Sequence, residues 1–237
     1  MSSVLRNILD SIRQRRSQRP VVIFDLDGTL YDNRPRTLRI LHAFAAALPA
    51  EHARDARTML RVTAGDLGYK LEDTLRPRGV SEAVLELCRR AWAARFFTDT
   101  ACADDVPQRG AVPFVRQCYD LGATVVYLTG RDTPNMLVGT VRALRDDGFP
   151  IGLPRVELVL KPTFEEPDTA FKIRMLDAMD ELGVVVGTFE NEPGNANMFL
   201  SRWPLGVHVL LETQHAPGAP ALDPRAFAVG DFTLDGH

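Results

Sequence analysis

The sequence predicts an α/β protein in which a Rossmann-like parallel sheet carries helices on both faces and is interrupted by an all-helical segment. The first observation is that short apolar runs of strand length alternate with segments of helical periodicity from residue 107 onward. The second is that residues 35–106 are rich in Ala, Leu and Arg, have helical periodicity and contain no strand-like run. We therefore expect a core built from residues 20–34 and 107–237, and an inserted helical cap over residues 35–106.

Residues 1–19 are expected to form an amphipathic helix before the core. Leu5, Ile8, Leu9 and Ile12 recur at helical spacing, and the helix then meets an arginine-rich stretch and Pro20. A solvated helix end explains those arginines better than an anionic partner does.

The core elements follow in order. A buried strand is expected at residues 21–24, where an apolar run is bounded by Pro20 and Gly28. In the cap, Ser81 before Glu82 is a candidate helix N-cap. The remaining elements are helices at 108–122, 133–148 and 168–183, strands at 123–130, 155–160, 184–190 and 207–211, and a short return element at 226–232.

Composition excludes several classes of protein. With 28 Lys and Arg against 31 Asp and Glu, the chain has no basic excess that would indicate nucleic-acid binding. No apolar run approaches the ~18 residues that a bilayer span needs, and no signal-peptide core begins the sequence, so we expect no membrane association. The 3 cysteines form no CxxC pair, which favours a reducing cytoplasm. The oligomeric state stays open.

Two carboxylates lie where the first strand ends. Asp25 and Asp27 are separated by one residue and followed by Gly28, and ligands of open α/β sheets bind beyond the carboxyl ends of the strands. Two such close carboxylates repel each other unless a cation intervenes. Mg²⁺ is the natural partner because it prefers oxygen ligands and tolerates phosphate oxygens.

Other strand ends add polar groups to the same edge. The second core strand ends in Thr129-Gly130-Arg131, whose hydroxyl and backbone N–H suit phosphate oxygens. A later strand ends in Glu190, followed by further polar residues. Two lysines, Lys161 and Lys172, follow the strand between these two, and either could bring a positive charge to the crevice.

Taken in order, these residues resemble the four motifs of the haloacid dehalogenase superfamily. The DxDGT sequence at Asp25 is highly specific when the later motifs follow it, and the resemblance covers about two thirds of the chain. It implies Asp25 as nucleophile and Asp27 as general acid/base, with Thr129, Gly130 and Arg131 binding the phosphoryl group.

The resemblance also implies Mg²⁺ held by the Asp25 carboxylate, the Asp27 backbone carbonyl and Glu190. The family commonly has aspartates in its last motif, so Asn191, Glu192 or Asn195 is a candidate for additional metal support. Lys172 is favoured over Lys161 as the catalytic lysine because it opens a helix, as the family pattern does.

The predicted activity is hydrolysis of a small phosphorylated substrate through an aspartyl-phosphate. Asp27 disfavours carbon–halogen cleavage, because the dehalogenase members of the superfamily lack that second aspartate. The alternatives are a phosphomutase or other phosphoryl transferase of the same fold, and a non-catalytic phosphate-binding relative. The helical cap, of the first cap type in the family, would exclude bulk water and contact the substrate.

Overall fold

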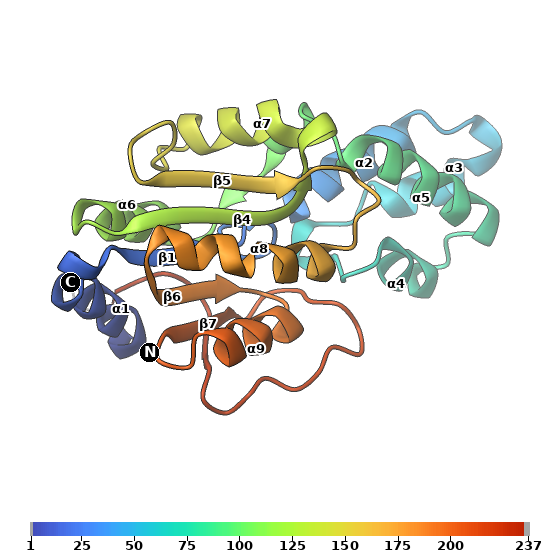
Figure 1. Cartoon of the computed structure of the whole chain (residues 1–237). Helices are drawn as coiled ribbons and strands as arrows, with labels where there is room; N and C mark the ends of the chain where they lie inside the picture. The colour runs from blue at the N-terminus through green and yellow to red at the C-terminus, as the bar shows by residue number, and fades with distance from the viewer. Residues whose placement is uncertain (1, 235–237) are drawn as a thin grey trace.

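A parallel sheet forms the centre of the molecule (Figure 1), as the sequence predicts. The computed structural model describes residues 2–234, so residue 1 and residues 235–237 of the predicted terminal segments lie outside it. The sheet has six strands in the order β5-β4-β1-β6-β7-β8, and every neighbouring pair is parallel. Its strands are β1 (Pro20–Phe24), β4 (Thr124–Asp132), β5 (Val156–Lys161), β6 (Val184–Glu190), β7 (Val207–Leu211) and β8 (Phe227–Val229).

Helices cover both faces of the sheet because successive strand residues point to opposite sides. Val22 and Phe24 join an apolar cluster with α1 (Ser2–Gln14), α6 (Ala111–Asp120) and α7 (Thr133–Asp146). Val21 and Ile23 point the other way, toward the two helices in front of the sheet in Figure 1. These helices are α8 (Asp168–Leu182) and α9 (Pro193–Arg202).

The N-terminal helix packs as predicted. All four of its apolar stripe residues are buried, and they contact the same cluster as Val22 and Phe24. The arginine-rich end of the helix is largely exposed to solvent, apart from the half-buried Arg15.

The inserted helices lie together beyond the carboxyl ends of the strands (Figure 1). They are α2 (Arg34–Ala46), α3 (Ala53–Met59), α4 (Leu71–Leu75) and α5 (Glu82–Phe96). Short 3₁₀ turns connect them at η2 (Ala50–His52), η3 (Ala64–Asp66), η4 (Arg76–Arg78) and η5 (Ala101–Asp104), and η1 (Arg16–Gln18) follows α1. Leu41, Met59, Leu75 and Val84 belong to an apolar core of their own, so the insertion has its own packing.

Three local expectations need correction. Helix α9 is absent from the predicted elements, because its opening Pro193-Gly194-Asn195 is typical of a loop. The stems of the cap pair as a two-stranded antiparallel ribbon, β2 (Tyr31–Asp32) and β3 (Val106–Pro107), which only tertiary proximity creates. Ser81 precedes α5 but makes no capping hydrogen bond; its hydroxyl donates to Asp55 instead, at 2.7 Å.

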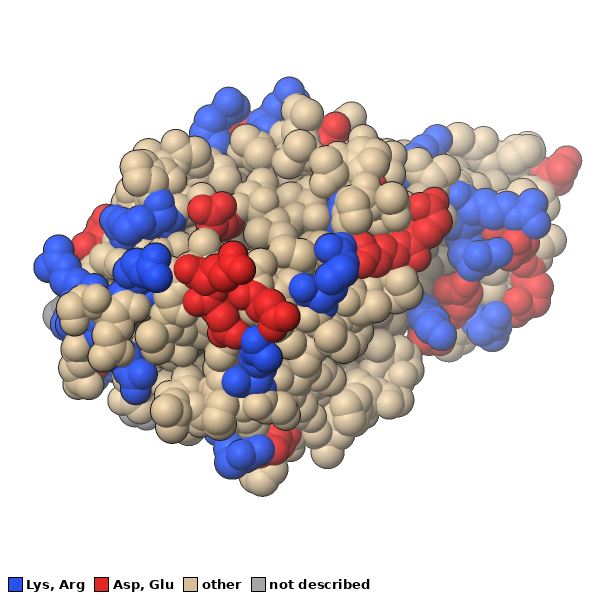
Figure 2. All heavy atoms as spheres, in the orientation of Figure 1, with Lys and Arg blue, Asp and Glu red and all other residues tan. Residues whose placement is uncertain are grey.

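Charges are interspersed on the face that α8 and α9 form (Figure 2). There Arg202 pairs with Asp177 and Asp180 at 2.6 and 2.5 Å. None of the helices among residues 2–234 is long and apolar enough to cross a membrane. Cys88, Cys102 and Cys118 are all buried and unpaired.

Candidate active site

The polar strand ends meet at one cavity, as the parallel sheet requires. The cavity has a volume of about 1310 Å³ and lies between the carboxyl edge of the sheet and the inserted helices. From the core it is lined by Asp25, Asp27, Gly130 and Lys172, and from the cap by aromatic residues that include Trp92, Phe96 and Phe97. The site therefore has a charged floor and an apolar wall.

Lys172 joins the two carboxylates at the floor of the cavity. Its Nζ donates to Asp25 Oδ1 at 2.7 Å and also to Glu190 Oε1. Asp25 follows β1, Glu190 ends β6, and Lys172 lies in the second turn of α8, so three separate elements supply one ion cluster. All three residues are buried, so the stability of each charged side chain depends on the charges of the other two.

Burial sets the proton affinity of the nucleophile candidate. Loss of solvent raises the pKa of Asp25 to about 7, and the nearby Glu190 charge adds to this, although Lys172 opposes it. One ammonium group therefore compensates the two buried carboxylates incompletely. A further positive charge at this point would stabilise the ionised form of Asp25.

Glu190 is fixed by its own loop. Its Oε2 accepts the backbone N–H groups of Asn191 and Glu192 at 3.1 and 3.2 Å, and its Oε1 accepts Asn195 Nδ2 at 3.1 Å. Asn191 is turned elsewhere, since its Nδ2 donates to Gln214 O at 2.7 Å. Glu192 accepts the Ala216 N–H at 2.9 Å. Of the three proposed supporting residues, Asn195 is thus the one whose side chain contacts Glu190.

Lys161 does not join this cluster. Its Nζ donates to the Phe164 and Glu166 carbonyl oxygens at 3.1 and 2.9 Å and pairs with Asp168 at 2.8 Å. It therefore holds the loop between β5 and α8. Of the two lysines, Lys172 is the one that contacts Asp25.

The Thr129-Gly130-Arg131 segment leaves the regular ladder between β4 and β5. Thr129 is fully buried and accepts the Arg131 N–H at 3.2 Å. A Cβ on Gly130 would lie 2.3 Å from a carboxylate oxygen of Asp168, the first residue of α8, so the Asp168 side chain would have to move to admit one. The start of α8 and the Gly130 backbone consequently border the same corner of the cavity.

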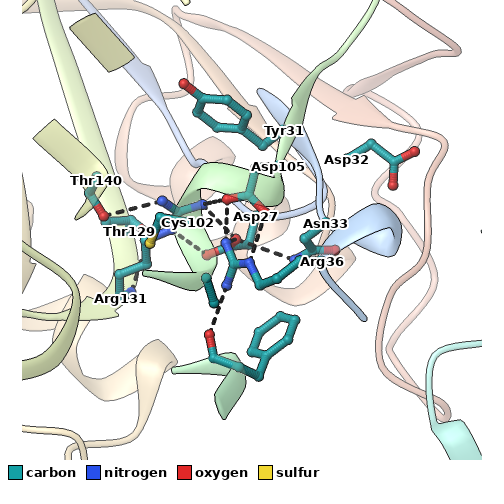
Figure 3. Close-up of polar contacts among 12 residues, drawn as sticks. Asp27, Tyr31, Asp32, Asn33, Arg36, Cys102, Asp105, Thr129, Arg131 and Thr140 are labelled. Carbon is teal, nitrogen blue, oxygen red and sulfur yellow. Dashed lines mark hydrogen bonds and ion pairs between the residues drawn. The ribbon is translucent and has the colours of Figure 1, made fainter. Parts of the chain in front are cut away.

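Asp27 is held by two arginines rather than facing Asp25 alone (Figure 3). Arg131 donates to it from Nε at 2.9 Å and from Nη2 at 2.8 Å, and Arg36 Nη2 adds a contact at 3.1 Å. Asn33 Nδ2 lies 3.3 Å from the same Oδ1. Burial raises the pKa of Asp27, but the charges of Arg131 and Arg36 outweigh burial and hold it well below its usual range.

Asp105 completes this group as a second acceptor. Arg36 donates to it from Nε at 2.8 Å and also from Nη2, and Arg131 Nη2 donates at 2.7 Å. Burial raises the pKa of Asp105 against the opposing charges of Arg131 and Arg36. Figure 3 shows the two guanidinium groups between the two carboxylates. Arg131 thus directs its side chain to Asp27 and Asp105.

Arg36 and Asp105 were missed by the reasoning from sequence. Arg36 lies in an ordinary helical segment and Asp105 follows Asp104 in a polar stretch. A usable signal exists for Arg36 alone: it is a charged residue on the face of α2 that also carries the buried Ile40. Nothing in the local sequence of Asp105 distinguishes it.

The carboxylates do not form a dense metal cluster. Across residues 2–234, no group of three or more His, Cys, Asp or Glu side chains is arranged to hold a metal ion. The predicted ligand set uses two carboxylates and a backbone carbonyl, which is a different kind of site.

Comparison with solved structures shows a shared fold. The chain resembles protein tyrosine kinase A of Mycobacterium tuberculosis with a TM-score of 0.54 and 17% identity, over 90% of this chain and 94% of that one. A haloacid dehalogenase-like hydrolase of Burkholderia xenovorans gives 0.52 and 18%, over 91% and 94%. A haloacid dehalogenase-like family protein of Streptococcus pneumoniae gives 0.51 and 10%, over 90% and 94%. No family model and no curated protein matches the sequence.

Proposed function

We propose that the chain is a haloacid dehalogenase-like phosphatase that hydrolyses a small phosphomonoester with Mg²⁺ as cofactor. The observation that carries this proposal is the contact of Lys172 with both Asp25 and Glu190 at the floor of a cavity that the helical cap lines on its other side. The fold alone does not choose the reaction, since the similar structures include a protein named as a kinase as well as hydrolases.

Asp25 would attack phosphorus. Its carboxylate oxygen forms a bond to phosphorus while the bond between phosphorus and the leaving oxygen breaks. Lys172 supports this step because its ammonium group contacts Asp25 and lowers the proton affinity that burial raises. The Gly130 backbone borders the same cavity, and together with the preceding Thr129 it would hold the transferring phosphoryl oxygens.

Asp27 would handle the protons. In the first step it gives a proton to the leaving alcohol oxygen, and in the second it takes one from the water that attacks phosphorus. That attack breaks the bond between phosphorus and Asp25 and releases inorganic phosphate. In this conformation Asp27 faces Arg36 and Arg131, so its carboxyl group has to turn from them to reach the leaving oxygen.

The donor set fits Mg²⁺. Asp25 and Glu190 offer buried carboxylate oxygens whose charge Lys172 compensates incompletely. The Asp27 carbonyl lies in the loop after β1, and Asn195 lies in the first turn of α9. Oxygen donors with one or two carboxylates are what this cation prefers. When bound there, Mg²⁺ would supply charge stabilisation to the phosphoryl group.

The cap would contact the leaving group. Trp92, Phe96 and Phe97 pack edge to face or tilted against one another, with ring centroids 4.5–5.7 Å apart. Phe97 also reaches Phe164 of the core at 5.0 Å, so the apolar wall spans both parts of the molecule. Such a wall would exclude bulk water from the reaction.

We also propose that the protein acts in the cytoplasm, because its three buried cysteines form no disulfide and so suit a reducing compartment.

The test is hydrolysis of p-nitrophenyl phosphate with Mg²⁺ and with EDTA. We expect release of phosphate with Mg²⁺, none with EDTA, and none from Asp25→Asn in either condition. Asp120→Asn, which changes an exposed aspartate, serves as the matched control and should remain active. Activity of Asp25→Asn near that of the unmodified chain would refute the mechanism. Phosphoryl exchange that needs a bisphosphate activator, with little net phosphate, would favour the mutase.

A further inference from the structure

Asp105 contacts both arginines that hold Asp27. We propose that Asp105 is a positioning residue: it keeps Arg36 and Arg131 in place as their permanent counterion, so that Asp27 can leave them and turn toward the substrate. The part of this inference that concerns turnover rests on the proposed function, whereas the part that concerns the counterion does not.

The two carboxylates differ in their access to solvent. The Asp105 side chain is fully buried, whereas the Asp27 side chain is 29% exposed and lines the cavity. Water or a substrate group can therefore fill the place that Asp27 vacates. The place of Asp105 has no such access, so its loss leaves buried guanidinium groups short of a counterion.

The arginines keep most of their contacts when Asp27 turns away. Arg36 retains Asp105 and the Phe96 carbonyl oxygen, which accepts Nη1 at 3.3 Å. Arg131 retains Asp105 through Nη2 and Thr140 through Nη1, at 2.7 and 3.1 Å. Of the nitrogen atoms in the two guanidinium groups, only Arg131 Nε has Asp27 as its single acceptor among the described residues. When Asp27 turns away, Arg131 Nε is therefore the nitrogen that loses its acceptor, and the other nitrogens of the two guanidinium groups keep theirs.

Proton transfer requires that release. Asp27 Oδ1 accepts three donors and Oδ2 accepts Arg131 Nε. Both oxygens are therefore engaged by the arginines, whereas the oxygen that carries the proton to a substrate has to face the leaving oxygen. The side chain must turn, and a fixed pair of arginines makes the turn repeatable.

The network also ties both cap stems to Asp27. Arg36 lies in the first turn of α2, where the chain enters the cap, and Asp105 follows η5, where the chain returns. Beside them, Asp32 pairs with Val106 in the β2–β3 ribbon. Two members of this network, Arg36 and Asp105, thus come from the segments that carry the cap, whereas Arg131 comes from β4 of the core.

The first experiment compares thermal unfolding of Asp27→Asn and Asp105→Asn. We expect Asp105→Asn to lower the unfolding midpoint by at least about 6 °C and Asp27→Asn to lower it by less than about 3 °C. The reason is that only Asp105→Asn removes a counterion from buried guanidinium groups at a place that water cannot reach. Asp104→Asn is the matched control; its partner Arg39 is 74% exposed, so water can solvate the arginine and the pair should matter little. Equal losses for the two variants, or a larger loss for Asp27→Asn, would overturn the counterion role. This comparison needs no turnover.

The second experiment compares two leaving groups. Glycerol phosphate needs a proton on its leaving oxygen, whereas p-nitrophenyl phosphate barely does, so the ratio of the two kcat values reports on Asp27. We expect Asp105→Asn to lose roughly tenfold or more with glycerol phosphate and to keep most activity with p-nitrophenyl phosphate. An equal loss with both substrates, or no loss with either, would refute a positioning role.

Asp105→Glu covers the case in which Asp105→Asn does not fold. It keeps the charge, so we expect an unfolding midpoint near that of the unmodified chain and a lowered ratio of the two kcat values. An unchanged ratio in this variant contradicts the inference. If the unmodified chain hydrolyses neither substrate, the proposed function fails, while the thermal comparison still decides the counterion role.

Discussion

Substitution of Gly139 by alanine tests how closely the returning cap stem lies against the core. Gly139 is inside α7, and a Cβ there would lie 2.1 Å from the Asp99 carbonyl oxygen and 2.6 Å from its Cα. The Gly139 N–H also donates to Asp99 Oδ1 at 2.5 Å. Since the obstructing atoms belong to the backbone, the segment must move by more than an ångström to admit a methyl group.

Two opposing effects set the size of the change. Alanine is favoured over glycine in a helix interior by about 0.5–1 kcal/mol. Overpacking costs about 1–3 kcal/mol, and a backbone obstacle belongs at the upper end of that range. We expect a net loss of about 2–2.5 kcal/mol, which corresponds to a fall of roughly 4–10 °C in the unfolding midpoint for a chain of this size.

The assay is thermal and urea unfolding, with Gly194→Ala as the matched control. Gly194 lies in the first turn of α9, where a Cβ would meet only Pro220 at 3.7 Å, an ordinary contact. That variant should be neutral or slightly more stable. If Gly139→Ala proves as stable as Gly194→Ala, then residues 97–104 do not lie against α7, and the described attachment of the cap stem is wrong.

Two further predictions concern charge. Lys172→Met should abolish phosphatase activity while Lys161→Met retains most of it, because only Lys172 contacts Asp25. Equal losses of activity in steady-state assays of the two variants would contradict the role given to Lys172. Burial lowers the pKa of His208 below the value of ~6.5 that it has in the unfolded chain. As the pH falls below that value, the unfolded chain takes up a proton on His208 before the folded chain does, and the stability of the folded chain decreases. His208→Gln should remove this part of the pH dependence in urea titrations between pH 5 and 7, whereas His215→Gln, at an exposed position, should not. Identical slopes of stability against pH in the two variants would refute the prediction.

The sheet was predictable because its strands are short apolar runs whose ends carry polar residues. Periodicity places Val21 and Ile23 on one face and Val22 and Phe24 on the other, and the structure has this alternation. What periodicity could not supply is pairing that depends on distant segments. The β2–β3 ribbon has two residues per strand, too few for any pattern, and exists because the fold brings both cap stems together.

The convergence of Asp25, Lys172 and Glu190 was also accessible from sequence, since parallel strands bring their carboxyl ends to one edge. The partners of Asp27 were not. Arg36 and Asp105 are separated by 69 positions, and their contact with each other depends on how the cap stems pack. A guanidinium group can reach in several directions from one backbone position, so the direction of Arg131 was likewise undetermined by its place after Gly130.

Knowing these partners relocates the charge imbalance of the site. From the sequence alone, the carboxylates at the sheet edge face a single lysine, which suggests that all of them share one excess of negative charge. In the structure, Asp27 and Asp105 are balanced by two arginines, whereas Asp25 and Glu190 share one ammonium group. The uncompensated negative charge therefore belongs to Asp25 and Glu190, where the pKa of Asp25 rises to about 7. A divalent cation has an electrostatic reason to bind at these two carboxylates and none at the Asp27 carboxylate, which already has its counterions.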